Sequence, residues 1–468
     1  MKKLIASLLL FSSLAVVVSS CSKDDPPLPP NTITFQAAEV GLDAAQNEAT
    51  VTITLDRAES VEVPVTLTMT ATGAIYGTDF TTTPAATGTE VKVVIPANSN
   101  TVSFKVTKAS AALLSGGEKV KFTLASYGSL TLGATKEATV SFSSIVSTGT
   151  TAFIIPGKTT ASNYANQVYV DFSNNAAVTA DRKSWNLGFQ SGSNFRVILN
   201  QAYQASAGAT SKTDISAVTI ADADALNLAF DPGAGSVSVV DNWTGDLTKT
   251  VFAEVSANAA ENKVYLVVNE SNRASKADWF KVKVTRNGDN YKVEYAKLSE
   301  TTIKTIEVPK AAGYNFSFVS LENSKIVSVE PKAASWDIAW TYGTYDAGNG
   351  TPYWFQDFIL LNYLGGAGAA EVIVPPAAGA TVTTEAETIA KFDAFAEANL
   401  SGITWLTTRD AIGSKWRVTT GTGIKRDRFY LIKDPAGNIY KIRFVKMGVG
   451  DTGERGRPEI DFKLVKKA

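Results

Sequence analysis

The 468-residue sequence contains no histidine and only one cysteine, Cys21. Histidine is the usual general base near neutral pH and the commonest metal ligand. Its absence excludes Ser-His-Asp and Cys-His catalysis and nearly all zinc geometries, and a single cysteine excludes a disulfide within the chain. Only carboxylate chemistry of the glycosidase kind stays open, and no pair stands out among the 45 acidic residues. We therefore expect a protein that is not an enzyme and has no metal site.

Charge of one sign is also lacking, because 44 Lys and Arg residues nearly cancel 45 Asp and Glu residues. A nucleic-acid partner needs a concentrated basic face, so none is expected. The chain is instead rich in Thr, Val, Ala, Gly and Ser, which is typical of strands joined by turns. Its hydrophobic content of 44% is ample for cores. A prior of about 150 residues per domain indicates about three domains.

The N-terminus has the pattern of an export signal. Lys2 and Lys3 precede an apolar stretch, residues 4–18, that is too short to span a bilayer, which needs about 20 apolar residues. Val18-Ser19-Ser20-Cys21 resembles the lipobox of bacterial lipoproteins. We expect a signal peptide at residues 1–20 and a membrane anchor through lipid on Cys21. The alternative is a plain signal peptide followed by an incidental cysteine.

Residues 21–31 read as the lipidated cysteine and a proline-rich linker. Ser22-Lys23-Asp24-Asp25 resembles the acidic export tag of Bacteroidetes lipoproteins, which implies an outer-membrane lipoprotein facing the cell exterior. The alternative is a charged, solvated start to the linker. Four prolines within residues 26–30 favour an extended spacer.

Residues 32–146 contain short alternating runs, such as residues 49–55 and 120–124, that predict an antiparallel β-sandwich. Tyr76-Gly77-Thr78-Asp79-Phe80 and Glu118-Lys119-Val120-Lys121-Phe122 resemble Calx-β and related immunoglobulin-like domains. The calcium sites of this family need clustered acids in the loop before the second of these segments, but Lys108-Ala109-Ser110-Ala111-Ala112 carries no carboxylate. We therefore expect a structural spacer or an interaction module without calcium.

The rest of the chain is a tandem repeat. The segment Trp185-Asn186-Leu187-Gly188 recurs as Trp336-Asp337-Ile338-Ala339. Four further segments recur in the same order: 198–200 as 360–362, 264–267 as 429–432, 279–284 as 439–444 and 293–295 as 460–462. A period this long predicts two whole domains, residues 147–308 and 309–468, with the boundary near Val308 and Pro309.

Each copy is expected to be mainly β with one small helical insertion. In the second copy, Thr384 and Glu387 form a capping-box pattern. The apolar spacing that follows predicts a helix ending at Gly402. In the first copy, residues 222–228 predict a shorter counterpart.

The ordered motifs of each copy resemble the HmuY family of Bacteroidetes haem-binding lipoproteins: an opening strand, the Trp-[Asp/Asn] strand, a Leu-Asn strand, a Gly/Ala turn, a Tyr-Leu segment and a closing strand pair. The resemblance implies an all-β fold and a surface lipoprotein that binds haem or a related porphyrin and passes it to an outer-membrane transporter. The chain departs from the family because the usual His ligands of iron are missing and Met447 is the one methionine within the repeat. At most Met447, or a tyrosine such as Tyr342, would bind iron from one side.

An aromatic loop distinguishes the second copy from the first. Two strands carrying aromatic residues about the turn at residues 346–350 would form a stacking platform for a porphyrin or a sugar ring. The candidate ligand-binding residues are Trp340, Tyr342, Tyr345, Tyr353, Trp354 and Met447. The alternatives are that these aromatic residues face the core, or that the protein is a non-catalytic adhesin or a glycan-binding surface lipoprotein.

Overall fold

A computed structural model describes residues 29–42, 47–109, 118–142, 146–230, 235–346, 350–419 and 421–468. The expected signal peptide, Cys21 and the first residues of the linker lie outside these ranges. The chain divides into two compact units, Met1–Ser143 and Ser144–Ala468. Strands make up 42% of the described residues and helices 9%, so the all-β prediction is confirmed.

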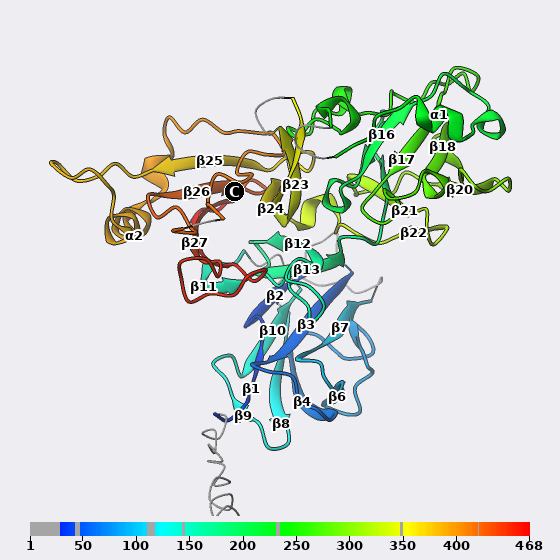
Figure 1. The fold of residues 1–468 in the computed structure, drawn as a ribbon. Helices are drawn as coiled ribbons and strands as arrows, with labels where there is room; N and C mark the ends of the chain where they lie inside the picture. Colours follow the sequence, from blue (N-terminus) through cyan, green and yellow to red (C-terminus); the bar gives the residue numbers. More distant parts are fainter. Residues whose placement is uncertain are drawn as a thin grey trace, which may run out of the picture. The chain divides into compact units, whose positions relative to one another are not determined.

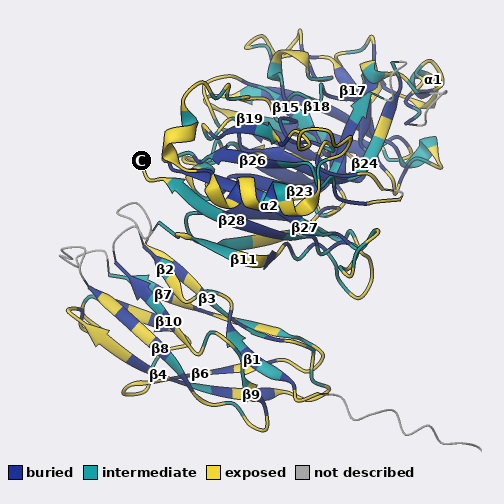
Figure 2. Ribbon diagram, turned by 90° about the vertical axis from the view of Figure 1, so that its left-hand side faces the viewer, coloured by how far each residue is buried: buried dark blue, intermediate teal, exposed yellow. Residues whose placement is uncertain are grey.

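The N-terminal unit is a sandwich of two five-stranded sheets, with strand orders β5-β7-β3-β1-β9 and β2-β10-β8-β4-β6. Buried and exposed residues alternate along its strands (Figure 2), so that branched apolar side chains from both sheets fill one core. The strands are β1 (Thr32–Phe35), β2 (Glu39–Gly41), β3 (Glu48–Leu55), β4 (Val63–Thr72), β5 (Phe80–Thr83), β6 (Glu90–Ile95), β7 (Thr101–Lys108), β8 (Lys119–Ser126), β9 (Thr131–Leu132) and β10 (Glu137–Ser141).

The C-terminal unit consists of two lobes with the same topology. The contiguous lobe, which runs from β14 to β22, has the sheets β15-β14-β21-β22 and β16-β17-β18-β19-β20. Its strands are β14 (Leu187–Gln190), β15 (Val197–Leu199), β16 (Ser206–Ala209), β17 (Val264–Val268), β18 (Phe280–Asn287), β19 (Asn290–Lys297), β20 (Lys304–Val308), β21 (Phe316–Ser320) and β22 (Lys325–Val327).

The two-segment lobe combines β11 to β13 with β23 to β28 (Figure 1). Its sheets, β24-β23-β12-β13 and β25-β26-β27-β28-β11, match those of the contiguous lobe strand for strand. Its strands are β11 (Gly149–Ile154), β12 (Asn166–Asp171), β13 (Ala176–Asp181), β23 (Ile338–Asp346), β24 (Pro352–Leu361), β25 (Gly368–Ile373), β26 (Arg428–Lys433), β27 (Ile439–Lys446) and β28 (Glu459–Lys466).

The lobes are offset from the sequence repeat. The opening hairpin of the first copy, β12-β13, pairs with β23 of the second copy, and the opening hairpin of the second copy, β21-β22, pairs with β14 of the first. Likewise β11, at the start of the first copy, pairs with β28, the last strand of the second. The repeat is therefore present as expected, but the boundary near Val308 and Pro309 does not separate the two closed lobes.

The helical insertions are present with altered bounds. The capping box of Thr384 and Glu387 begins α2 as expected, but α2 (Glu385–Ala394) ends well before Gly402. Extended backbone at Phe395 and a separate 3-10 turn follow it. The first copy has α1 (Ile220–Asp224), which begins and ends earlier than predicted because Thr219 and Asp222 form its capping box.

Candidate functional site

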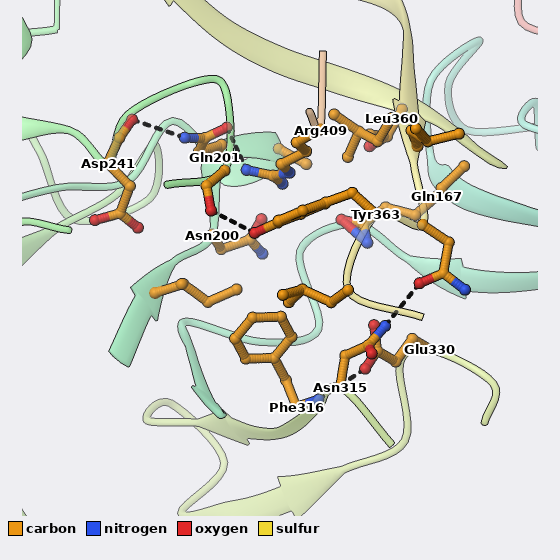
Figure 3. Close-up of a pocket in the computed structure, with 18 of the residues that line it drawn as sticks. Gln167, Asn200, Gln201, Asp241, Asn315, Phe316, Glu330, Leu360, Tyr363 and Arg409 are labelled. Atoms are coloured by element: carbon orange, nitrogen blue, oxygen red, sulfur yellow. Dashed lines mark hydrogen bonds between the residues drawn. The ribbon is translucent and has the colours of Figure 1, made fainter. Parts of the chain in front are cut away.

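A hollow lies between the two lobes and is lined by equivalent positions of both (Figure 3). Trp185 and Trp336 occupy matching places in the repeat, as do Asn200 and Asn362. The cavity volume is about 70 Å³. Since one water needs roughly 10–15 Å³ by this measure, the hollow holds about five waters. It suits a compact ligand and is too small to enclose a porphyrin.

Aromatic and aliphatic side chains form most of the wall of this hollow. The rings are Tyr169, Trp185, Phe316, Phe318, Trp336, Tyr342 and Tyr363. Tyr169 packs edge-on against Trp336 at 5.1 Å between centroids, and Trp185 packs edge-on against Phe318 at 4.7 Å. The two lobes therefore each contribute a matching pair of rings to the wall.

Buried and half-buried polar groups interrupt the aromatic wall. Arg409 donates to the Gln201 side-chain oxygen at 2.8 Å, and the Gln201 amide donates to the Asp241 carbonyl at 3.0 Å. The Asp241 carboxylate accepts from the Leu199 backbone at 2.6 Å. Burial raises the pKa of Asp241 to about 6, although these hydrogen bonds and Arg409 oppose the rise. Burial also raises the pKa of Glu330, to about 8.

The aromatic residues expected to form a platform lie on the hairpin of β23 and β24. Tyr342 and Trp354 stack on each other with centroids 3.6 Å apart and planes 10° apart. The Arg182 guanidinium lies 5.0 Å from both ring centroids, a distance at which a cation interacts with an aromatic face. The Trp354 indole donates to the Gln201 carbonyl at 3.1 Å, which connects the hairpin to the hollow.

The other candidates are divided between the hairpin and the core. Tyr353 is 43% exposed and packs edge-on against Phe355, which Tyr345 also contacts edge-on. Trp340 is fully buried; a Cβ at Gly157 would overlap its ring, so glycine is required there. For Trp340 the core alternative is therefore correct.

Met447 is only 1% exposed and packs in the core of the two-segment lobe. The expectation that it would be open to a ligand in the final loop is wrong, because strand residues and Trp416 surround that loop's apolar side. Tyr342 is poorly suited to iron as well. Burial raises the pKa of its hydroxyl, which disfavours the tyrosinate that would bind iron.

A buried ion pair supports the hairpin from behind. Asp357 is fully buried on β24, has a left-handed φ of 53°, and pairs with Arg455 at 2.8 Å. The Tyr164 hydroxyl donates to the same carboxylate at 3.0 Å, and the Trp416 indole donates to the Asp357 carbonyl at 3.0 Å. A non-glycine residue in this conformation stores strain that the surroundings must hold in place. The cluster therefore fixes the irregular part of the hairpin.

The sequence did not indicate the charged residues of the hollow or of the β23-β24 hairpin. Arg182 lies three residues before Trp185 of the recurring motif, but a single arginine carries no pattern. Glu330, Arg409 and Asp357 lie far apart in the chain, and only the fold places them. Within the described ranges, no group of three or more Asp, Glu, His or Cys residues could hold a metal ion. No helix among these residues is long and apolar enough to cross a membrane.

These features define a two-lobed, all-β protein with a hollow between its lobes and an aromatic hairpin on one of them. The chain belongs to the HmuY protein family, whose model matches residues 163–305 and 313–462 and thus both copies of the repeat. The family is associated with haem binding. No curated protein matches the chain.

Solved structures similar to the chain include the apo-form Calx CBD1 domain (16% identity, 25% of this chain and 97% of that chain, TM-score 0.21). The structure of CBD12 from CALX1.2 is also similar (13% identity, 32% of this chain and 75% of that chain, TM-score 0.20). Another is a two-domain protein of unknown function from Bacteroides fragilis (14% identity, 40% and 72% coverage, TM-score 0.19). The Calx matches fall on the N-terminal portion.

Proposed function

We propose that this protein is a non-catalytic lipoprotein of the outer membrane that captures a flat, anionic ligand, haem or a related porphyrin, at the cell surface. The stacked pair of Tyr342 and Trp354 beside Arg182 carries the proposal. Membership of a family associated with haem binding supports it. An outer-membrane transporter is the partner to which such a ligand would pass.

The binding mode we propose uses the porphyrin ring instead of its iron. Ring faces on the hairpin stack on a flat macrocycle. The Arg182 guanidinium is buried, donates to the Tyr164 and Ala202 carbonyls and pairs with Glu270, so it supports the rings from inside the protein. Met447 is buried, Met69 is buried in the N-terminal sandwich, and the sequence has no histidine. Iron-free porphyrin should therefore bind about as well as hemin.

Absorption titrations of the chain without residues 1–21 test this mode. Hemin and iron-free protoporphyrin should both give a shifted Soret band, with affinities within roughly threefold. Trp354→Ala should weaken both by about tenfold, since a base-sized aromatic stack is worth roughly 1–3 kcal/mol. Trp405→Ala, which removes a half-buried tryptophan outside the hairpin, is the matched control. An unchanged spectrum with both porphyrins contradicts the proposal, and binding of hemin alone contradicts the ring-based mode.

The anchor is tested separately in cells. Cys21→Ala should abolish incorporation of radiolabelled palmitate and release the protein from membranes, because the acyl chains supply the membrane affinity. Protease added to intact cells should cleave the wild-type protein if it faces outward. Labelling of the Cys21→Ala variant would show that the anchor lies elsewhere.

A glycan is the second candidate ligand. Tyr353 favours it, because this aromatic residue of the hairpin is 43% exposed and contacts Phe355 edge-on. Retention on a polysaccharide gel should be lost in Tyr353→Ala and Trp354→Ala. Retention that is unaltered in both variants rules the hairpin out as a glycan site.

A further inference from the structure

The hollow between the lobes contains a buried carboxyl group that has no cationic partner. Glu330 is 7% exposed and accepts a hydrogen bond from the Phe316 backbone at 2.8 Å. Among the described residues, no Lys or Arg forms a salt bridge with it. Burial of an ionised carboxylate without a counterion is costly, so burial raises the pKa of Glu330 to about 8 and the group is mostly a neutral acid at pH 7. The unpaired acid in a cavity therefore calls for an explanation.

The other charges of the hollow are balanced without Glu330. Arg409 is connected to Asp241 through the Gln201 side chain and lowers the pKa of both Asp241 and Glu330. The pKa of Asp241, about 6, leaves it ionised at neutral pH. Asp246 lies at the exposed rim and pairs with Lys249 at 3.1 Å. Glu330 is thus the acid of the described lining that remains available to a charged ligand.

The remaining wall suits a cation with an apolar surface. The faces of Trp, Tyr and Phe rings attract cations, and aromatic cages recognise methylated ammonium groups. Figure 3 places Phe316 and Tyr363 in this wall, with Glu330 and Arg409 set apart from each other. A hollow for about five waters is of the size of a methylated ammonium group.

We infer that the hollow between the lobes binds a small organic cation of the methylated-ammonium class, with the Glu330 carboxylate as its counterion. On binding, the Glu330 carboxylic acid releases its proton to the solvent and the ligand's charge replaces it. The titratable groups that act on Glu330 are Arg409, Tyr169 and Tyr363. Arg409 favours the carboxylate. Both tyrosines stay neutral, since burial raises their pKa values, that of Tyr363 to about 12.

Calorimetric titration of the chain without residues 1–21 with choline tests the inference. Its uncharged carbon isostere, dimethylbutanol, serves as the matched ligand. Choline should bind at least tenfold more tightly than dimethylbutanol at pH 8. Because binding displaces a proton from a group whose pKa is about 8, choline affinity should rise about fivefold from pH 7 to pH 8, a range in which Asp241, with a pKa of about 6, is already ionised. Dimethylbutanol should show no such dependence.

Two variants distinguish loss of the counterion from loss of the folded structure. Glu330→Gln should weaken choline binding at least tenfold and remove its pH dependence, and Glu307→Gln, a change at an exposed site on β20, should do neither. Tryptophan emission checks that both variants are folded. Equal binding of the two ligands, no binding of choline, or preferential binding of acetate would each overturn the inference. Porphyrin binding on the hairpin is measured independently and should be unchanged in Glu330→Gln.

Discussion

The contiguous and two-segment lobes have the same strand order but different polar interiors. In the contiguous lobe, the Asn186 side-chain oxygen accepts from the Leu321 backbone at 2.6 Å, and its amide donates to Glu322 at 3.1 Å. In the two-segment lobe the equivalent residue is Asp337, which accepts from the Phe172 backbone at 2.7 Å. The same backbone donor is thus satisfied by an amide in one lobe and by an acid in the other.

The lobes differ also in the hairpin that follows this position. The strands β14 and β15 of the contiguous lobe are short, and Lys310 closes their loop by donating to the Gly192 carbonyl at 2.7 Å and lying 3.6 Å from the Phe195 centroid. The corresponding β23 and β24 have 9 and 10 residues and carry the stacked aromatic pair. The hairpin is therefore short and closed in the contiguous lobe and extended in the two-segment lobe, which is where we place the ligand.

Separate expression of fragments provides the strongest test of the lobe definition. Residues 182–331 contain all strands of the contiguous lobe, so this fragment should fold and unfold cooperatively in urea. Residues 147–308, cut at the sequence repeat, keep β15 beside β14 but lack β21, its other partner strand, and also lack β23 and β28, the partners of β12 and β11. Unpaired strand edges favour aggregation, so this fragment should be insoluble or unfolded. The opposite result would show that each sequence copy folds on its own.

A buried lysine in each lobe gives the next largest contrast. Lys441 donates to the carbonyls of Asp393 and Phe395 at 3.0 and 2.8 Å, and also to that of Phe392, at the end of α2. The equivalent Lys281 donates to one carbonyl, that of Val218, at 3.4 Å. An unsatisfied buried group costs about 1–3 kcal/mol. Lys441→Met should therefore lower the free energy of unfolding by about 3 kcal/mol, and Lys281→Met by about 1 kcal/mol.

Tryptophan fluorescence during urea unfolding measures both variants selectively, because all eight tryptophans lie in the repeat region. Equal losses in the two variants would show that the extra contacts of Lys441 do not stabilise the two-segment lobe. A loss of stability in Lys281→Met alone would show that the buried lysine matters more in the contiguous lobe than in the two-segment lobe.

The lysine contacts illustrate which features the sequence could predict and which it could not. Alternation and the recurring motifs predicted the strands, the repeat and the capping box at Thr384, since these are local patterns. The end of α2 was missed because Lys441, from a distant strand, binds the carbonyls there. The exchange of hairpins was missed because β14 pairs with β21 across more than a hundred residues, and pairing within one copy would bury the same alternating pattern. The aromatic hairpin was found from clustering, whereas Glu330 and Arg409 gave no local signal.

The smallest expected effect concerns the acid at Asp337. Burial, with the charges of Asp171 and Asp434 nearby, raises the pKa of Asp337 well above its ordinary value. The folded state then holds a proton that the unfolded state releases, so this contribution to stability is fully present below about pH 4 and is lost as pH rises through the folded pKa. Asp337→Asn keeps the acceptor for the Phe172 backbone and should raise the free energy of unfolding at pH 8 by roughly 1 kcal/mol or more. The gain in the free energy of unfolding should vanish at pH 4.

The reverse change, Asn186→Asp, places a second acid beside Glu322 and should destabilise the contiguous lobe at pH 8. If Asp337→Asn lowered stability equally at both pH values, the acid would be a required part of the lobe, and the two interiors would differ in more than their charge.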